Sequence, residues 1–92
     1  MNDEQNLRFA SPSALREFVL ETASQLHKAN LTKAGEILEA AANYVTSSGW
    51  EWLGELGLAS EKIRNEYQLP SNIASRTERV LTAVKSQQPY SH

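Results

Sequence analysis

Histidines and paired carboxylates are the side chains of this sequence that could bind a metal ion or transfer protons. There are two histidines, His27 and the C-terminal His92. A carboxylate-bridged metal site in a helical bundle needs Glu-x-x-His pairs, whereas the residue three positions before His27 is Ser24. Three carboxylate pairs have helical spacing: Glu17 and Glu21, Glu36 and Glu39, and Glu51 and Glu55. These pairs fall on predicted polar faces, so we expect solvated side chains, no metal ion, no cofactor and no catalytic residue.

Nucleophilic and phosphate-binding chemistry finds equally little support. The 92 residues include no cysteine, which excludes disulfides, thiolate ligands and thiol catalysis and fits a reducing compartment. Gly49, Gly54 and Gly57 do not have the spacing of a phosphate-binding loop and follow no predicted strand. The serines have no base at a catalytic spacing. We therefore expect that the protein is not an enzyme.

Two tryptophans point to a contact surface instead. Trp50 and Trp52 are two positions apart, so on one helix their side chains diverge by about 160° and cannot both enter the same core. Trp52 continues an apolar stripe, whereas Trp50 aligns with Gly54, Gly57 and Glu61. A tryptophan beside a line of glycines exposes backbone to a partner, and tryptophan is a frequent interface anchor. The predicted interface is Tyr44, Trp50, Trp52, Gly54 and Gly57. The alternative is that Trp50 folds over the preceding loop and closes the end of the bundle.

The segment from residue 63 to residue 79 loosely resembles a helix-turn-helix, in which the second helix reads DNA bases. The resemblance implies that Asn72, Ser75, Arg76 and Arg79 point outward, towards bases and phosphates. The turn around Pro70 lacks the usual glycine. The formal net charge is −2, whereas DNA-binding domains are usually basic. A small nucleic-acid-binding regulator is therefore the alternative function, beside the simpler interpretation of a solvated face.

Amphipathic helices are the elements that would position these side chains. Ser11 and Pro12 favour a helix start, and the apolar spacing predicts a helix over 12–29 that Asn30 ends. Thr32 is expected to cap a second, alanine-rich helix over 32–46. Because alanine is small, its surface is shallow and would let a neighbouring helix approach closely.

Two further helices are predicted in the second half of the chain. Ser48 and Glu51 fit a capping box that begins a helix over 49–67, in which Gly57 could introduce a kink. Pro70 closes that helix, and a fourth starts at residue 71 or 72 and runs to 86. The expected core positions are Leu15, Phe18, Val19, Ala23, Leu26, Ala34, Ile37, Leu38, Ala41, Ala42, Val45, Leu53, Leu56, Ser60, Ile63, Tyr67, Ile73, Thr77, Val80, Leu81 and Val84.

Short connections between these helices predict an all-α fold: a four-helix antiparallel bundle of two αα-hairpins. We expect an N-terminal arm over 1–10, one helical domain over 11–86 and a disordered tail over 87–92. The polar start and the lack of a long apolar run argue against a leader or a membrane span, so a cytoplasmic protein is expected. A thin core with a surplus tryptophan favours a partner. The leading function is therefore a small non-enzymatic protein–protein interaction module of regulator, adaptor or inhibitor type. Its partner would be another protein or a second copy of the chain.

Overall fold

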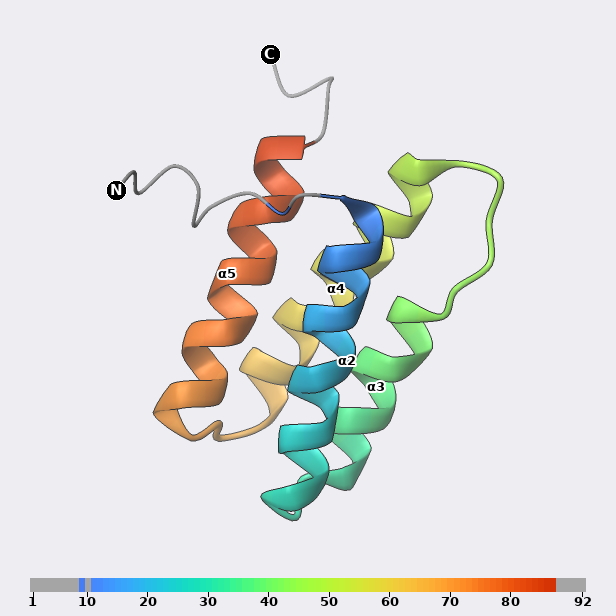
Figure 1. Ribbon diagram of the computed structural model, residues 1–92. Coiled ribbons are helices and arrows are strands. Elements are labelled where there is room, and N and C mark those ends of the chain that lie inside the picture. Colours follow the sequence, from blue (N-terminus) through green and yellow to red (C-terminus); the bar gives the residue numbers. More distant parts are fainter. Residues whose placement is uncertain (1–8, 10, 88–92) are drawn as a thin grey trace.

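The computed structural model describes residues 9 and 11–87, and within these residues the chain forms four helices and no strand (Figure 1). The helices are α2 (Pro12–Lys28), α3 (Thr32–Ala42), α4 (Gly49–Glu66) and α5 (Ser71–Gln87). The predicted all-α helical bundle is confirmed. The arm and tail predictions fall mostly on residues 1–8, 10 and 88–92, which lie outside the described residues. Gln87, assigned to the tail from sequence, belongs to α5.

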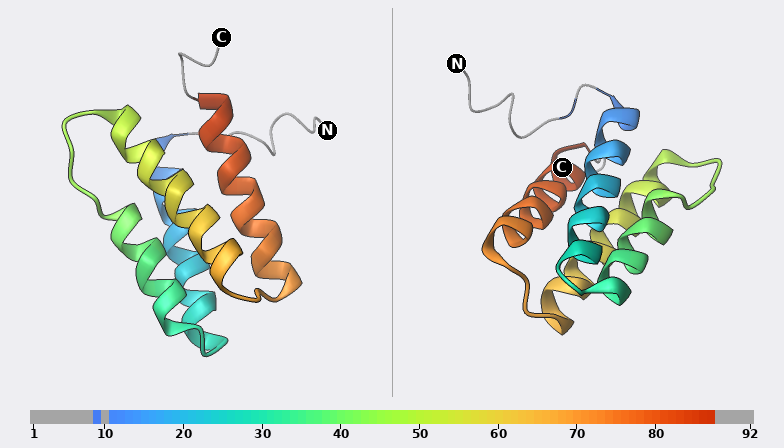
Figure 2. Two further views of the ribbon diagram at one scale, coloured as in Figure 1. Left: turned by 180° about the vertical axis from the view of Figure 1, so that it is seen from behind. Right: turned by 60° about the horizontal axis from the view of Figure 1, so that its bottom comes forward.

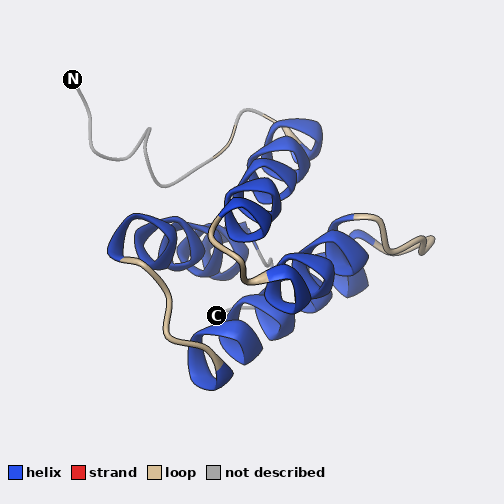
Figure 3. Cartoon of the chain, turned by 90° about the horizontal axis from the view of Figure 1, so that it is seen from below, coloured by secondary structure: helices blue, strands red, loops and turns tan. Residues whose placement is uncertain are grey.

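The four described helices form a ring in which each helix packs on two neighbours. Helix α2 packs on α3, α3 on α4, α4 on α5 and α5 on α2, with the most extensive contact between α2 and α3 and the least between α2 and α5. In Figure 1 the chain runs down α2, up α3, down α4 and up α5. Figure 2 shows from behind that α4 lies between α3 and α5. The connections 29–31 and 67–70 lie at the same end, which Figure 3 shows from below.

The junction between α2 and α3 is set by the end of the first helix. Ser11 caps α2 as predicted, because its hydroxyl accepts from the Ala14 amide at 3.1 Å and so satisfies a free helical N–H. Asn30 has a φ of 67°. It allows the Leu31 amide to donate back to the Leu26 carbonyl at 2.8 Å, which is the Schellman arrangement. Leu31 is then also the N-cap of α3, with no side-chain cap. The prediction of Thr32 as the N-cap was wrong.

Helix α3 ends at Ala42, four residues before the predicted end, and the cause is a competition for one carbonyl. In a continuing helix the Ala42 carbonyl would accept from the amide of residue 46. Instead it accepts from Arg16 Nε at 3.2 Å and from Trp52 Nε1 at 3.1 Å. Val45, predicted to lie in the core, is 91% exposed in the connection that follows.

Helix α4 begins with half of the predicted capping box. The Ser48 hydroxyl accepts from the Glu51 amide at 3.4 Å. The Glu51 carboxylate does not return to the Ser48 amide, because it accepts from the Thr46 hydroxyl, and the Ser48 amide donates to that same Thr46 oxygen at 3.1 Å. The helix then continues without interruption through Gly54 and Gly57 to Glu66.

The core follows the predicted apolar stripes closely. Its largest fully buried apolar side chains are Leu15, Val19, Leu26, Leu38, Leu56, Ile63, Ile73 and Val80. Phe18, Ile37 and Tyr67 are half-buried against this core. Gly35 and Ala83 are buried although the stripes did not include them. The four helices thus cover one continuous apolar interior.

Candidate interaction surface

The two tryptophans lie on different sides of α4, as their spacing predicts. Trp52 is half-buried against the core, and its indole N–H donates to the last carbonyl of α3 at 3.1 Å. Trp50 is 44% exposed at the first turn of α4. Trp52 therefore joins α3 to α4, and Trp50 is the tryptophan that a partner could reach.

Trp52→Phe is expected to lower the free energy of unfolding by about 1–3 kcal/mol, because one hydrogen bond is lost and the smaller ring leaves part of the half-buried site unfilled. Urea denaturation measures this difference. Tyr44→Phe is the control: it removes the polar group of an aromatic side chain at an exposed position of the α3–α4 connection, so a change within about 0.5 kcal/mol is expected. Equal losses of unfolding free energy in both variants would contradict a stabilising role for the hydrogen bond from Trp52 to the last carbonyl of α3.

An apolar strip runs along the outward face of α4, and we define it as Trp50, Gly54 and Leu58. These residues are four positions apart, so they follow one another along a single line of the helix. Leu58 is 64% exposed. A Cβ added at Gly54 would meet no atom within 4 Å, so the backbone between the two large side chains is bare.

The other predicted interface residues are placed differently. Gly57 faces α5, because a Cβ there would lie 3.5 Å from Val84 Cγ1. Tyr44 is 43% exposed in the connection between α3 and α4. Sequence reasoning missed Leu58, although the signal was available: it is the apolar residue eight positions after Trp50 on the same helical line.

Charged residues border one edge of the strip. Glu51, Glu55 and Lys62 fall on neighbouring lines of α4, on the side away from Gly57. Lys62 Nζ lies 3.1 Å from Glu66 Oε2 in an ion pair whose two side chains are each about half exposed. The exposed Glu61 falls between the helical lines of Trp50 and Gly54, one turn after Leu58. The strip is therefore an apolar surface that has charges along one edge and a carboxylate at its C-terminal end.

The arginines proposed from sequence to face a nucleic acid are held against the protein itself. Arg76 Nε donates to Thr22 Oγ1 at 2.8 Å, and its Nη2 donates to the Phe18 carbonyl at 3.1 Å. The guanidinium also lies 3.9 Å from the centre of the Phe18 ring. Arg79 lies 4.5 Å from the centre of the Phe9 ring and 4.9 Å from that of Phe18. Both guanidinium groups therefore stack on aromatic rings, and neither points outward as the helix-turn-helix resemblance implied.

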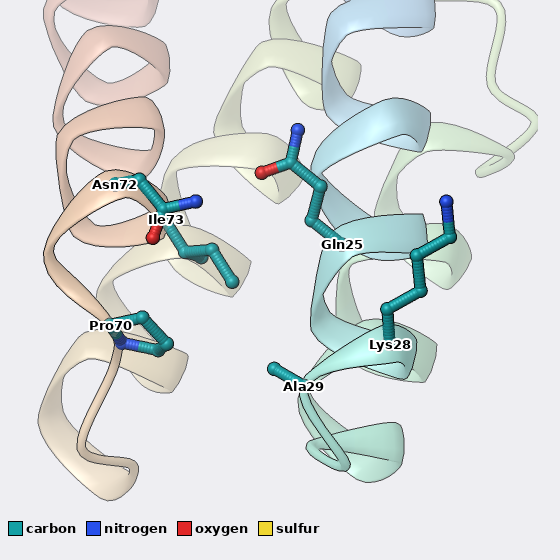
Figure 4. Close-up of a pocket in the computed structure, with 6 residues that line it drawn as sticks. All are labelled: Gln25, Lys28, Ala29, Pro70, Asn72 and Ile73. Carbon is teal, nitrogen blue, oxygen red and sulfur yellow. The ribbon is translucent and has the colours of Figure 1, made fainter.

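Asn72 and Ser75, the other two residues of that alternative, are exposed at the start of α5. Asn72 lines a shallow hollow of about 340 Å³ between the end of α2 and the start of α5 (Figure 4). Gln25 extends into this hollow from α2, and its Oε1 is buried without a hydrogen-bond donor among the described residues. Lys28 is the charged side chain of the lining, and the hollow is wide open to solvent. We assign no ligand to it.

The histidine of the described residues, His27, lies beside a carboxylate. His27 Nε2 lies 3.1 Å from Glu39 Oε2, across the seam between α2 and α3. Within residues 9 and 11–87, no group of three or more histidine, aspartate or glutamate side chains could hold a metal ion. Glu39 is half-buried beside His27 rather than fully solvated as expected. The pair links two helices.

None of the helices formed by the described residues is both long and apolar enough to cross a membrane. Comparison of the chain with protein-family models, curated protein sequences and solved structures gives no match.

Proposed function

We propose that this protein is a small, non-enzymatic protein–protein interaction module whose contact surface is the apolar strip on α4. The observation that carries the proposal is the exposure of Leu58, 64% accessible on a helix whose other leucines, Leu53 and Leu56, are buried. When a partner covers a large apolar side chain beside a bare glycine and an exposed tryptophan, apolar surface leaves water, which favours binding. A role as a regulator, adaptor or inhibitor in the cytoplasm is consistent with this surface and with a chain that has no cysteine.

The nucleic-acid alternative is not proposed further. It needs guanidinium groups that can reach phosphates or bases, whereas Arg76 and Arg79 stack on the rings of Phe18 and Phe9. The overall charge of −2 adds no attraction for a polyanion.

Leu58→Glu tests the contact surface. We expect this variant to fold normally, because Leu58 makes little contact with the core, and to weaken partner binding at least tenfold, because a carboxylate at the centre of an apolar contact is poorly solvated. Chemical cross-linking in cells followed by affinity capture measures complexes with another protein. Light scattering of the purified chain measures complexes between copies of the chain.

Ser24→Glu is the matched control, because it places the same charge on an exposed position of α2. It should leave every complex intact. If no complex of either kind depends on Leu58, or if Ser24→Glu disrupts complexes equally, the proposal is wrong.

A further inference from the structure

The exposed large apolar side chains of the described residues all come from the hairpin of α3 and α4. They are Tyr44, Val45, Trp50 and Leu58, whose accessible fractions run from 43% to 91%. Residues 34–61, which include all four, contain five glutamates and no lysine, arginine or histidine. Exposed apolar surface and uncompensated negative charge therefore coincide on the same part of the molecule.

Carboxylates flank Leu58, the most exposed side chain of the strip. Glu55 and Glu61 lie three positions before and three positions after Leu58, so both are its neighbours on the helix surface, on opposite sides of it. Glu51 lies one turn before Glu55 on the same edge. Among the described residues, none of these three carboxylates forms an ion pair. A partner that covers Leu58 therefore meets negative charge on both sides of the contact.

The basic residues near α4 do not neutralise these carboxylates. Lys62 Nζ is already held 3.1 Å from Glu66 Oε2. Arg64 and Lys85 lie beside the contact between Gly57 and α5, on the other side of α4 from Glu51 and Glu55. The edge of the strip opposite Gly57 therefore stays acidic.

Accepting the proposed function, we propose that the strip on α4 binds a basic amphipathic helix of another protein, in which lysines or arginines flank an apolar stripe. The apolar side chains of that helix cover Trp50 and Leu58, and its backbone approaches Gly54, where no Cβ holds the two helices apart. Cations on the two flanks of its stripe meet Glu55 and Glu61. From Trp50 to Leu58 the strip is about 12 Å long, so about two turns of the bound helix make the contact.

The same charges disfavour other occupants of the strip. A second copy docked antiparallel through Leu58 would place Glu55 of each copy opposite Glu61 of the other. Like charges in contact destabilise an interface. A nucleic acid or an anionic membrane surface would be repelled by the same carboxylates. A basic partner is the one whose charge favours the encounter.

The test uses the full chain and two synthetic amphipathic helices of equal length, one of leucines and lysines and the other of leucines and glutamates. We expect the lysine peptide to bind at least about tenfold more tightly than the glutamate peptide, measured by isothermal titration calorimetry. Leu58→Ser should weaken binding of the lysine peptide about tenfold, because the apolar contact is lost while the charges remain. A loss in this variant separates docking on the strip from adsorption by charge alone.

Charge reversal locates the attraction. The double variant Glu55→Lys and Glu61→Lys should bind the lysine peptide at least about tenfold more weakly than the wild type. The matched control, Glu17→Lys with Glu78→Lys, makes the same change in net charge at exposed positions of α2 and α5, and its binding should stay within about threefold of the wild type. Far-UV circular dichroism checks that both double variants fold.

Three results would overturn the basic partner: equal binding of the two peptides, no binding of the lysine peptide, or equal losses in the two double variants. Cellular complexes that depend on Leu58 but not on Glu55 and Glu61 would likewise overturn it, while the proposed interaction module would stand. Complexes that do not depend on Leu58 would instead overturn the proposed function itself.

Discussion

Replacing Gly35 with leucine is expected to lower the free energy of unfolding by about 2–3 kcal/mol, because the new side chain has no space between α2 and α3. In a domain of this size, that loss corresponds to a fall in Tm of about 10–20 °C. Thermal denaturation followed by circular dichroism at low protein concentration measures the effect without a contribution from association.

The physical reason is the close approach of α2 to Gly35 of α3. A Cβ on Gly35 would lie 2.9 Å from His27 Nε2 and 3.0 Å from the Ala23 carbonyl oxygen. The imidazole could turn away, at the cost of its contact with Glu39, but the Ala23 carbonyl belongs to the backbone of α2 and cannot. Leucine would therefore separate the two helices that share the largest contact of the fold.

Gly54→Ala is the control for the helical propensity of glycine. A Cβ at Gly54 meets nothing within 4 Å, so this substitution should raise the free energy of unfolding by roughly 0.5–1 kcal/mol. A Gly35→Leu variant that is as stable as the wild type would show that the helices separate at no cost, and would contradict the close packing of α2 on α3.

Apolar periodicity was sufficient to predict the four helices and most of their core, because each stripe depends on residues within a few turns of one another. The sequence also predicted that the alanines of the second helix would allow a close approach, whereas the tight contact with α2 lies at Gly35 of that helix. Gly35 itself was missed, because a glycine inside a helix acquires its role only when a specific backbone lies against it.

The surface was harder to predict than the core for the same reason. The spacing of Trp50 and Trp52 correctly separated their two directions, since that separation is a property of one helix. The direction of Arg76 was wrong, because it depends on Phe18 and Thr22, which come from α2 more than fifty residues earlier in the chain. Likewise, α3 ends early through donors from two other helices.

Arg76→Ala is the second variant with a large expected effect, a loss of about 2–3 kcal/mol in the free energy of unfolding. The contact between α2 and α5 is the least extensive in the ring, and Arg76 spans it with two hydrogen bonds and a stacked ring. Its ion pair with Glu21, at 3.4 Å, adds little because Glu21 is largely exposed. Urea denaturation measures the loss.

Arg76→Lys separates the roles of charge and shape. Lysine keeps the positive charge, but its single ammonium cannot reach both Thr22 Oγ1 and the Phe18 carbonyl while stacking on the ring. We expect it to recover less than half of the lost stability. Arg64→Ala, which removes an arginine from an exposed position of α4, should change stability by no more than about 0.5 kcal/mol. If the Arg76→Lys variant matched the wild type, charge alone would hold α5 on α2. If Arg76→Ala were as mild as Arg64→Ala, the ring of four helices would close through its apolar core without the arginine.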